Sequence, residues 1–239
     1  MKNILTACLC VLLAVTALAQ KPNKLTGKEK KQGWILLFDG KTTNGWHTYL
    51  RDTVGSKWQV KEGTIIYDPS QPRSGGGDIV TNQEFENFDF RLEWKVAKAS
   101  NSGIIFNIQE KKEPGFNATY SSGIEMQVLD NIDAADKNPE THLAGSMYDM
   151  FGGAAVSKPK PVGEWNHARI LQNKGRITFW LNDVMTADVQ VGSDEWNAVL
   201  AKSKFSKGFP NFAKVLKGKI ALQEHPGSSA WRNIKIQPL

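Results

Sequence analysis

Apolar and polar residues alternate with a period of two over much of this chain. In FDFRLEWKV, residues 88–96, aromatic and aliphatic side chains fall on one face and charged side chains on the other. This alternation is typical of an antiparallel strand with one face against a core. Comparable runs predict further strands within 57–68, 102–109, 123–130, 167–189, 218–225 and 231–239, with turns at 62–63, near 173–175 and at 182–183.

Helical periodicity is weak, and the best candidate is SDEWNAVLAKSKF, where Ser193 or Asp194 would cap a short helix from Glu195. Many short strands separated by Gly, Pro and Asn predict an all-β fold, a two-sheet antiparallel β-sandwich of jelly-roll type with little helix. The irregular stretches 68–77, 111–122 and 131–162 exceed ordinary hairpin loops. Since long loops on a rigid scaffold commonly carry function, we expect them to surround a site.

Two predicted strands carry more hydrogen-bonding groups on their second face than solubility requires. In GIEMQVLDN, residues 123–131, Glu125 and Gln127 alternate with apolar residues. In IALQEH, residues 220–225, Gln223 and His225 share the face opposite Ile220, Leu222 and Glu224. We predict that these four side chains line a concave surface. A carboxylate that fixes a loop and a loop-end histidine bonded to backbone are the structural alternatives for Glu125 and His225.

The other aromatic and histidine signals favour structural roles. Trp46, after the turn residues 39–45, and Trp165 are interpreted as packing residues, with sugar stacking as the alternative for Trp46. His142 lies in a long loop from which it could reach a cleft, although a structural role is favoured. His47 and His167 are assigned to the fold or to solvent.

The first 19 residues read as a signal peptide. Lys2 precedes the apolar stretch ILTACLCVLLAVTA, and Ala-Leu-Ala at 17–19 is a small-x-small cleavage signal before Gln20. Cys8 and Cys10, the only cysteines, lie in that segment, so the mature chain would have no disulfide and no thiol nucleophile. Export to the bacterial periplasm or beyond, with no membrane span in the mature protein, is the simplest interpretation.

Residues 20–32 read as an N-terminal extension and 33–239 as a single domain. The formal net charge is +6, and lysines are dense in GKEKK (27–31) and in 202–219, where aromatic residues are interleaved. That pattern occurs in nucleic-acid binders. An exported chain without a nucleic-acid motif argues against such a partner, and we interpret both runs as solvated loops.

Standard catalytic motifs do not match. The chain has no G-x-S-x-G, P-loop, H-E-x-x-H or EF-hand pattern, which removes the usual support for serine hydrolase, nucleotide, zincin and calcium-loop interpretations. The glycine-rich SGGGD at 74–78 lacks the strand-to-helix context of a phosphate loop, and we interpret it as a flexible loop.

An ordered series of segments resembles the 3-keto-disaccharide hydrolase domain family. The segments are LFDGKTTNGW, WQVKEGTI, DIVTNQEFENFDFRLEWKV, NSGIIF, GIEMQVLDN, AGSMY, KPVGEWNHARI, ITFWLND and IALQEHPGSSAWRNIKIQPL, spanning about residues 33–239. The resemblance implies a concanavalin A-like sandwich and hydrolysis of glycosides whose sugar has been oxidised to a ketone at C3 by a separate oxidoreductase. Two positions depart from the family: Asn107 stands where many relatives have arginine, and LND at 181–183 replaces LNG.

A ketone at C3 acidifies the C2 proton, so one base can remove it and allow elimination at C1 followed by hydration, without a carboxylate pair. On this hypothesis Glu125 and His225 share acid and base duties. The predicted substrate-binding residues are Gln127, Gln223, Asn101, Asp130, Tyr148 and Lys158. A divalent metal on Glu125 and His225 could polarise the ketone instead; no other cofactor is expected.

Three other functions compete with this hypothesis. A noncatalytic carbohydrate-binding module or lectin could use the same fold. A conventional glycanase would need a second carboxylate near Glu125, for which Glu93 and Glu224 are the candidates. A structural surface protein is the third.

Overall fold

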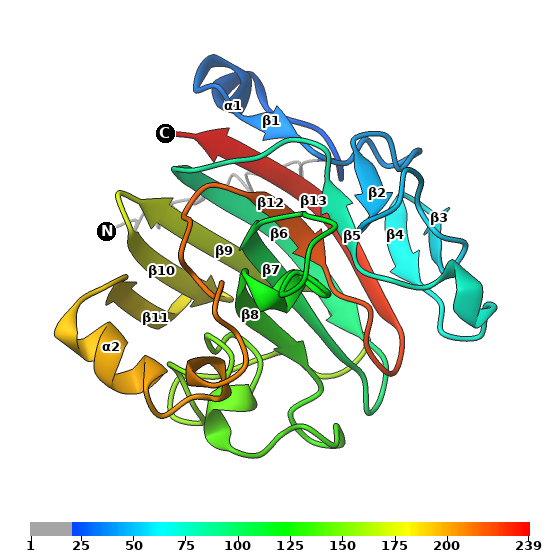
Figure 1. Cartoon of the computed structure of the whole chain (residues 1–239). Helices are drawn as coiled ribbons and strands as arrows, with labels where there is room; N and C mark the ends of the chain where they lie inside the picture. Colours follow the sequence, from blue (N-terminus) through cyan, green and yellow to red (C-terminus); the bar gives the residue numbers. More distant parts are fainter. Residues whose placement is uncertain (1–20) are drawn as a thin grey trace, which may run out of the picture.

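Residues 21–239, described here from a computed structural model, form two antiparallel sheets stacked face to face (Figure 1). The larger sheet has the strand order β11-β10-β9-β6-β13-β4-β3, with β1 also paired to β13. Its strands are β1 Ile35–Leu36, β3 Trp58–Lys61, β4 Thr64–Tyr67, β6 Phe88–Val96, β9 Asn166–Asn173, β10 Arg176–Leu181, β11 Val184–Gln190 and β13 Ser229–Pro238. The prediction of an all-β sandwich is confirmed.

The smaller sheet has the order β2-β5-β12-β7-β8. Its strands are β2 Trp46–Thr48, β5 Ile79–Thr81, β7 Asn101–Ile108, β8 Ile124–Leu129 and β12 Lys219–Leu222. The predicted hairpin turns are also present, because β3 and β4, β9 and β10, and β10 and β11 are each joined by two residues.

Alternating apolar residues of both sheets form one core between them. Phe88 of β6 and Phe179 of β10 each make an edge-to-face contact with Phe106 of β7, at centroid distances of 6.0 and 5.8 Å. Each of these rings is almost completely buried, and burial of such a side chain contributes about 1.5–3 kcal/mol. Trp46 is also buried, with its indole N–H donating to the Leu37 carbonyl at 2.7 Å, so its predicted packing role is confirmed.

A bulge in β7 turns Asn107 into this core. Between β12 and β7 the register moves from Lys219↔Ile108 to Ala221↔Ile105, so β7 has one extra residue there, and Asn107 has φ 62°. Its amide donates to Gln172 Oε1 at 2.7 Å, and Gln172 Nε2 donates back to Asn107 Oδ1 at 3.1 Å. Asparagine tolerates this left-handed conformation, which the bulge requires. Through its hydrogen bonds to Gln172 of β9, Asn107 links the two sheets in the interior.

The structure contains two short α-helices and four 3₁₀ turns within 21–239. α2, Asp194–Leu200, begins after Ser193, whose hydroxyl accepts from Trp196 N–H, as the sequence predicts. α1, Gly27–Lys31, corrects the expectation of a solvated loop, since Thr26 and Glu29 form a capping box that the lysine count obscures. The 3₁₀ turns are η1 Arg73–Gly75, η2 Thr119–Ser121, η3 Glu140–His142 and η4 Lys204–Ser206.

The long stretch 131–162 covers the edge of β8. Gly145 N–H donates to the Gln127 carbonyl, Gln127 N–H to the Ser146 carbonyl and Tyr148 N–H to the Glu125 carbonyl, at 2.8–3.0 Å. This segment thus pairs with β8 almost as a further strand and fixes Tyr148 beside Glu125. No helix within residues 21–239 is long and apolar enough to cross a membrane; the predicted signal peptide lies outside the described residues.

Candidate functional site

The outer face of the smaller sheet is apolar at one end and polar at the other. Val80, Ile105, Ile108 and Ala221 form a small buried cluster on this face, against which Tyr49 packs. Next to them, the same face carries Asn101 and Gly103 from β7 and Glu125 and Gln127 from β8, with Gly103 directly opposite Gln127. The polar end of the outer face of the smaller sheet therefore provides a set of buried hydrogen-bonding groups.

Glu125 is the buried acid of this face. Only 5% of the residue is exposed, and its carboxyl lies over Gly103, where a Cβ atom would fall 2.2 Å from Oε1. Burial raises the pKa of Glu125 to about 8; Asp78 and Asp136 add to the increase, whereas Lys204 and a hydrogen bond from Gln223 oppose it. Glu125 is therefore mostly protonated at neutral pH.

Three side chains around Glu125 have buried polar atoms without a protein partner. They are Asn101 Oδ1, Gln127 Nε2 and Gln223 Oε1. Nearly all buried polar atoms in native proteins are hydrogen-bonded, and these three come from neighbouring strands β7, β8 and the end of β12. Two acceptors and one donor on one patch are suited to the hydroxyl and carbonyl groups of a polar ligand.

His225 lies on the same side as Gln223. Gln223 N–H donates to the Gly103 carbonyl at 3.0 Å and Asn101 N–H donates to the Pro226 carbonyl at 2.9 Å, so residues 223–226 continue alongside β7. Although His225 is exposed enough to be reached from solvent, partial burial lowers its pKa; Lys204 adds to this effect and Asp136 opposes it. The imidazole is thus neutral at neutral pH, with the opposite shift to Glu125.

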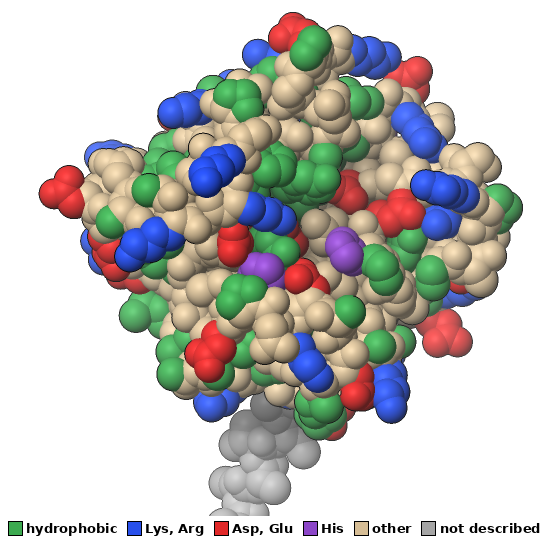
Figure 2. Space-filling model, turned by 60° about the horizontal axis from the view of Figure 1, so that its bottom comes forward, with side chains coloured by type: hydrophobic (Ala, Val, Ile, Leu, Met, Phe, Trp, Pro, Cys, Tyr) green, Lys and Arg blue, Asp and Glu red, His purple; other side chains and the backbone are tan. Residues whose placement is uncertain are grey.

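A network in the 131–162 loop borders the site. His142 is bonded through Nδ1 to Asp136 at 2.9 Å and through Nε2 to Asp149 at 3.2 Å, and its ring stacks on Tyr148 at 4.1 Å. The Tyr148 hydroxyl and the Asn101 amide also donate to Asp136, at 3.1 and 3.4 Å. Figure 2 shows, on one face of the molecule, histidine side chains close to acidic and basic side chains around a hollow.

Lys204 supplies the positive charge of the site. Its ammonium lies 4.2 Å from the centre of the Tyr148 ring, and its backbone N–H donates to Asp149 Oδ2 at 2.6 Å. The adjacent Phe205 anchors this segment, because it is buried and stacks on Phe212 at 3.9 Å. Sequence reasoning assigned Lys204 to a solvated run and missed Asp136; no spacing signal marks either residue.

The second carboxylate that a conventional glycanase needs is not supplied by either predicted candidate. Glu224 points away from Glu125 and accepts from Tyr67 Oη at 2.7 Å and Lys57 Nζ at 3.1 Å. Glu93 lies on the other sheet, bonded to Arg232. Asp78, like Asp136, is a carboxyl near Glu125 that the sequence did not indicate; burial raises the pKa of Asp78 to about 6, and it accepts from Thr119 and from Glu224 N–H.

Two predicted substrate-binding residues lie elsewhere. Asp130 accepts from the backbone N–H groups of Ala99 and Ile132, at 2.8 and 3.0 Å, and so shapes the turn after β8. Asp130 and Lys158 line a separate hollow of about 440 Å³. The structure therefore brings together Glu125, His225, Gln127, Gln223, Asn101 and Tyr148, without these two.

A metal site would need several nitrogen or oxygen ligands in one place. Within residues 21–239 there is no group of three or more His, Cys, Asp or Glu side chains arranged to hold a metal ion. In the site, Glu125 is protonated at neutral pH and His142 is already bonded through both ring nitrogens.

Comparisons with known proteins agree with this fold and show the family of this chain. The model of the 3-keto-alpha-glucoside-1,2-lyase-like domain matches residues 33–237. A protein from Bacteroides thetaiotaomicron named 3-keto-disaccharide hydrolase is 36% identical over 234 residues, covering 87% of this chain and 79% of the relative.

Solved structures give the same result for the fold. A crystal structure from Parabacteroides distasonis ATCC 8503, provisionally described as a glycosyl hydrolase, superposes with a TM-score of 0.81 at 30% identity, covering 92% of this chain and all of that one. A Bacillus subtilis protein of unknown function with a galectin-like fold superposes with a TM-score of 0.50 at 13% identity, covering 91% and 94% of the two chains. The second likeness supports the fold alone.

Proposed function

Because this chain belongs to the 3-keto-alpha-glucoside-1,2-lyase-like domain family, we propose that it cleaves glycosides whose sugar carries a ketone at C3. The resemblance noted in the sequence is thereby confirmed, and the chain is a hydrolase. The observation that carries the substrate proposal is that Glu125 and His225 both lie near Lys204 and Asp136, with pKa values shifted in opposite directions, in a site that has three unpartnered polar atoms.

The proposed roles of acid and base follow from the directions of the two pKa shifts. A neutral His225 accepts the C2 proton, and the electron pair delocalises onto the C3 oxygen as an enolate. The enolate then forms the C1=C2 bond and expels the C1 substituent, whose oxygen takes the proton of Glu125. Groups whose environments shift their pKa values apart are suited to such a division of roles.

In the hydration step, Glu125 and His225 transfer protons in the opposite directions. Water adds to C1 of the unsaturated ketone, Glu125 as carboxylate takes the proton of that water, and the His225 imidazolium returns a proton to C2. The net reaction is hydrolysis, and both residues regain their starting protonation states. The Gln127 amide and the Lys204 ammonium are the donors available to the enolate oxygen, a form of electrostatic stabilisation.

The names of the family and of the relative agree with this route. A 1,2-lyase step corresponds to the elimination, and the name hydrolase corresponds to elimination followed by hydration. A ketone at C3 requires prior oxidation of the sugar, so we propose an oxidoreductase as functional partner. We also propose export to the periplasm, on the basis of the N-terminal 19 residues.

The test follows aglycone release by the purified mature protein from a 3-keto glucoside and from the matching unoxidised glucoside, each with and without a chelator. Release from the keto sugar alone is expected. Equal release from both substrates would indicate a conventional glycanase, and binding of both without release would indicate a carbohydrate-binding module. If the chelator abolishes aglycone release and added metal restores it, the reaction requires a metal ion and the mechanism without metal is wrong.

Gly103→Ala should damage the same site without removing any functional group. The new methyl carbon would lie 2.2 Å from Glu125 Oε1 and 2.9 Å from its Cδ, so the carboxyl must move. A displacement of a catalytic group by about 1 Å costs about 10²-fold in rate. Gly27→Ala is the matched control, because no atom lies within 4 Å of its added Cβ; equal activity of the two variants would contradict the placement of Glu125.

A further inference from the structure

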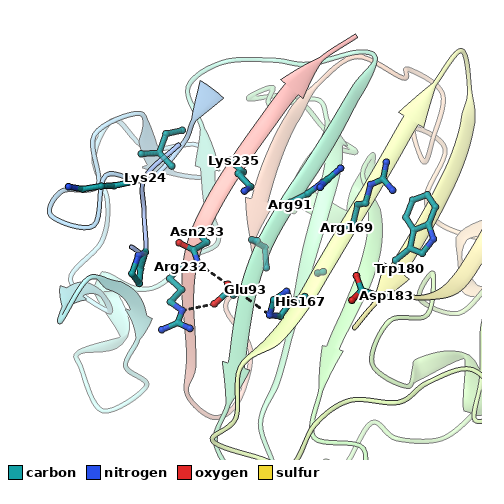
Figure 3. Close-up of a pocket in the computed structure, with 14 residues that line it drawn as sticks. Lys24, Arg91, Glu93, His167, Arg169, Trp180, Asp183, Arg232, Asn233 and Lys235 are labelled. Carbon is teal, nitrogen blue, oxygen red and sulfur yellow. Dashed lines mark hydrogen bonds and ion pairs between the residues drawn. The ribbon is translucent and has the colours of Figure 1, made fainter. Parts of the chain in front are cut away.

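A second concave region lies on the outer face of the larger sheet, which the proposed reaction does not use. It is a groove of about 670 Å³, shown in Figure 3. Its lining includes five basic side chains, Lys24, Arg91, Arg169, Arg232 and Lys235, and two acidic ones, Glu93 and Asp183. Glu29 also pairs with Lys235, and the groove still has more cations than acids beside it, which favours a negatively charged ligand.

The cations form a row across four strands. Trp180 of β10 is directly opposite Arg169 of β9, Arg169 is opposite Arg91 of β6, and Arg91 is opposite Lys235 of β13. Figure 3 shows these four side chains side by side across the strands. Like charges directly opposite one another destabilise a sheet, and this repulsion is reduced because Lys235 pairs with Glu29 and both arginines pair with Asp89.

Asp89, two residues before Arg91 on β6, orients the guanidinium groups of Arg91 and Arg169. Asp89 is only 5% exposed and accepts hydrogen bonds from Nε and Nη2 of Arg91, at 3.0 and 2.7 Å. It also accepts hydrogen bonds from Nε and Nη2 of Arg169, both at 3.0 Å. One carboxylate thus serves two cations. Each guanidinium keeps its Nη1 donors for another acceptor, and its side chain remains 43% exposed in Arg91 and 35% in Arg169.

Aromatic rings also hold these cations in place. The Arg169 guanidinium lies 4.4 Å from the Trp180 ring, and the Arg91 guanidinium lies 4.8 Å from the Trp34 ring. Such contacts reduce the freedom that a long side chain would lose on binding. The row is therefore pre-organised.

A second row along the groove is chemically mixed. His167 of β9 is opposite Glu93 of β6, which is opposite Arg232 of β13. Glu93 accepts from Arg232 at 2.6 Å and from the Asn233 amide at 2.7 Å. Figure 3 shows this row beside the first, with Asp183 at one end. Its carboxylate, amide and imidazole groups can exchange hydrogen bonds with hydroxyl groups.

We propose that this groove is a binding site for an acidic oligosaccharide, with carboxylate or sulfate groups on the arginine row and sugar hydroxyls on the mixed row. The acidic side chains favour a sugar over a nucleic acid, because Glu93 and Asp183 repel a continuous phosphate backbone but accept hydroxyl hydrogens. The site lies on the sheet opposite the catalytic face, so the proposal does not depend on the proposed reaction.

The test measures binding of the intact protein by calorimetry and in affinity gels. The probes are an oligogalacturonate, a sulfated heparin oligosaccharide, a neutral dextran oligosaccharide and single-stranded DNA of similar charge. Binding of at least one acidic sugar, weakened by salt, is expected, with no binding of dextran and weaker binding of DNA. The two acidic probes distinguish carboxylate from sulfate recognition.

Arg169→Gln should weaken that binding about 10–100-fold, the usual effect of losing hydrogen bonds to a charged group. Arg91 still pairs with Asp89 in this variant, which protects the fold, and circular dichroism checks it. Lys202→Gln removes an exposed charge elsewhere and should bind as wild type. Failure of both acidic sugars to bind, equal weakening by the two variants, or tighter binding of DNA would each overturn the proposal, whatever the result of the aglycone assay.

Discussion

Replacing Glu125 by Gln should lower turnover of a 3-keto glycoside by about 10²–10⁴-fold, the usual contribution of a positioned acid or base. The amide has nearly the same shape as the protonated carboxyl, so it keeps the packing over Gly103 and the contact with Gln223. It cannot give its proton to the leaving oxygen or take one from water. Initial rates on the keto glucoside, measured at substrate saturation, test the effect on kcat.

The same variant has a signature in stability that a carboxylate ionised in the folded protein would not produce. The pKa of Glu125 is about 8 in the folded protein against 4.5 for an ordinary glutamate. The folded state therefore keeps this proton where the unfolded state has lost it. The contribution of protonated Glu125 to the free energy of unfolding is fully present below pH 4.5. It is lost as the pH rises through 8, because the unfolded state ionises at lower pH than the folded state.

Glu125→Gln should therefore gain stability relative to wild type between pH 5 and pH 9, by on the order of 1–4 kcal/mol. Urea unfolding at several pH values measures this difference. Glu164→Gln, at an exposed position, is the control and should follow wild type at every pH. An unchanged difference between wild type and Glu125→Gln across this range would mean that the carboxyl is ionised in the folded protein. Normal turnover would remove Glu125 from the mechanism.

Strand periodicity predicted the centre of this site because it is a local property of the chain. Glu125 and Gln127 occupy alternate positions of β8, and Gln223 and His225 keep the same side while residues 223–226 run along β7. The register between β8 and β7 has no shift, so the polar face of β8 in the sequence is its polar face in space. Asn107 shows the converse, because the bulge in β7 sends its side chain into the core.

The rim of the site could not be derived in the same way. Asp136 and Lys204 lie in irregular segments, and their positions depend on His142, Tyr148, Asp149 and Phe205, which only the folded chain brings together. Asp130, at the end of a predicted strand, and Lys158, in the loop 131–162, were predicted to lie at the rim and instead line another hollow. Loop contacts have no period, whereas strand faces do.

His225→Gln should change the pH profile of kcat/KM as well as its height. With a neutral imidazole as base and a protonated carboxyl as acid, wild type should show a bell-shaped profile. Its rising limb would lie below the ordinary histidine value of 6.5 because burial and Lys204 lower the pKa of His225, and its falling limb would lie near 8, where Glu125 ionises. Losing the base should cost about 10²–10⁴-fold in rate.

The two limbs make the role assignment testable one residue at a time. His225→Gln should remove the rising limb and keep the falling limb, and Glu125→Gln should do the reverse. His167→Gln, whose side chain is 60% exposed on the other sheet, should keep both limbs and normal activity. If the rising limb persists in His225→Gln and disappears in Glu125→Gln, the carboxylate is the C2 base. The hydrogen bond from Gln223 and the charge of Lys204, both of which favour ionised Glu125, would then matter more than its burial.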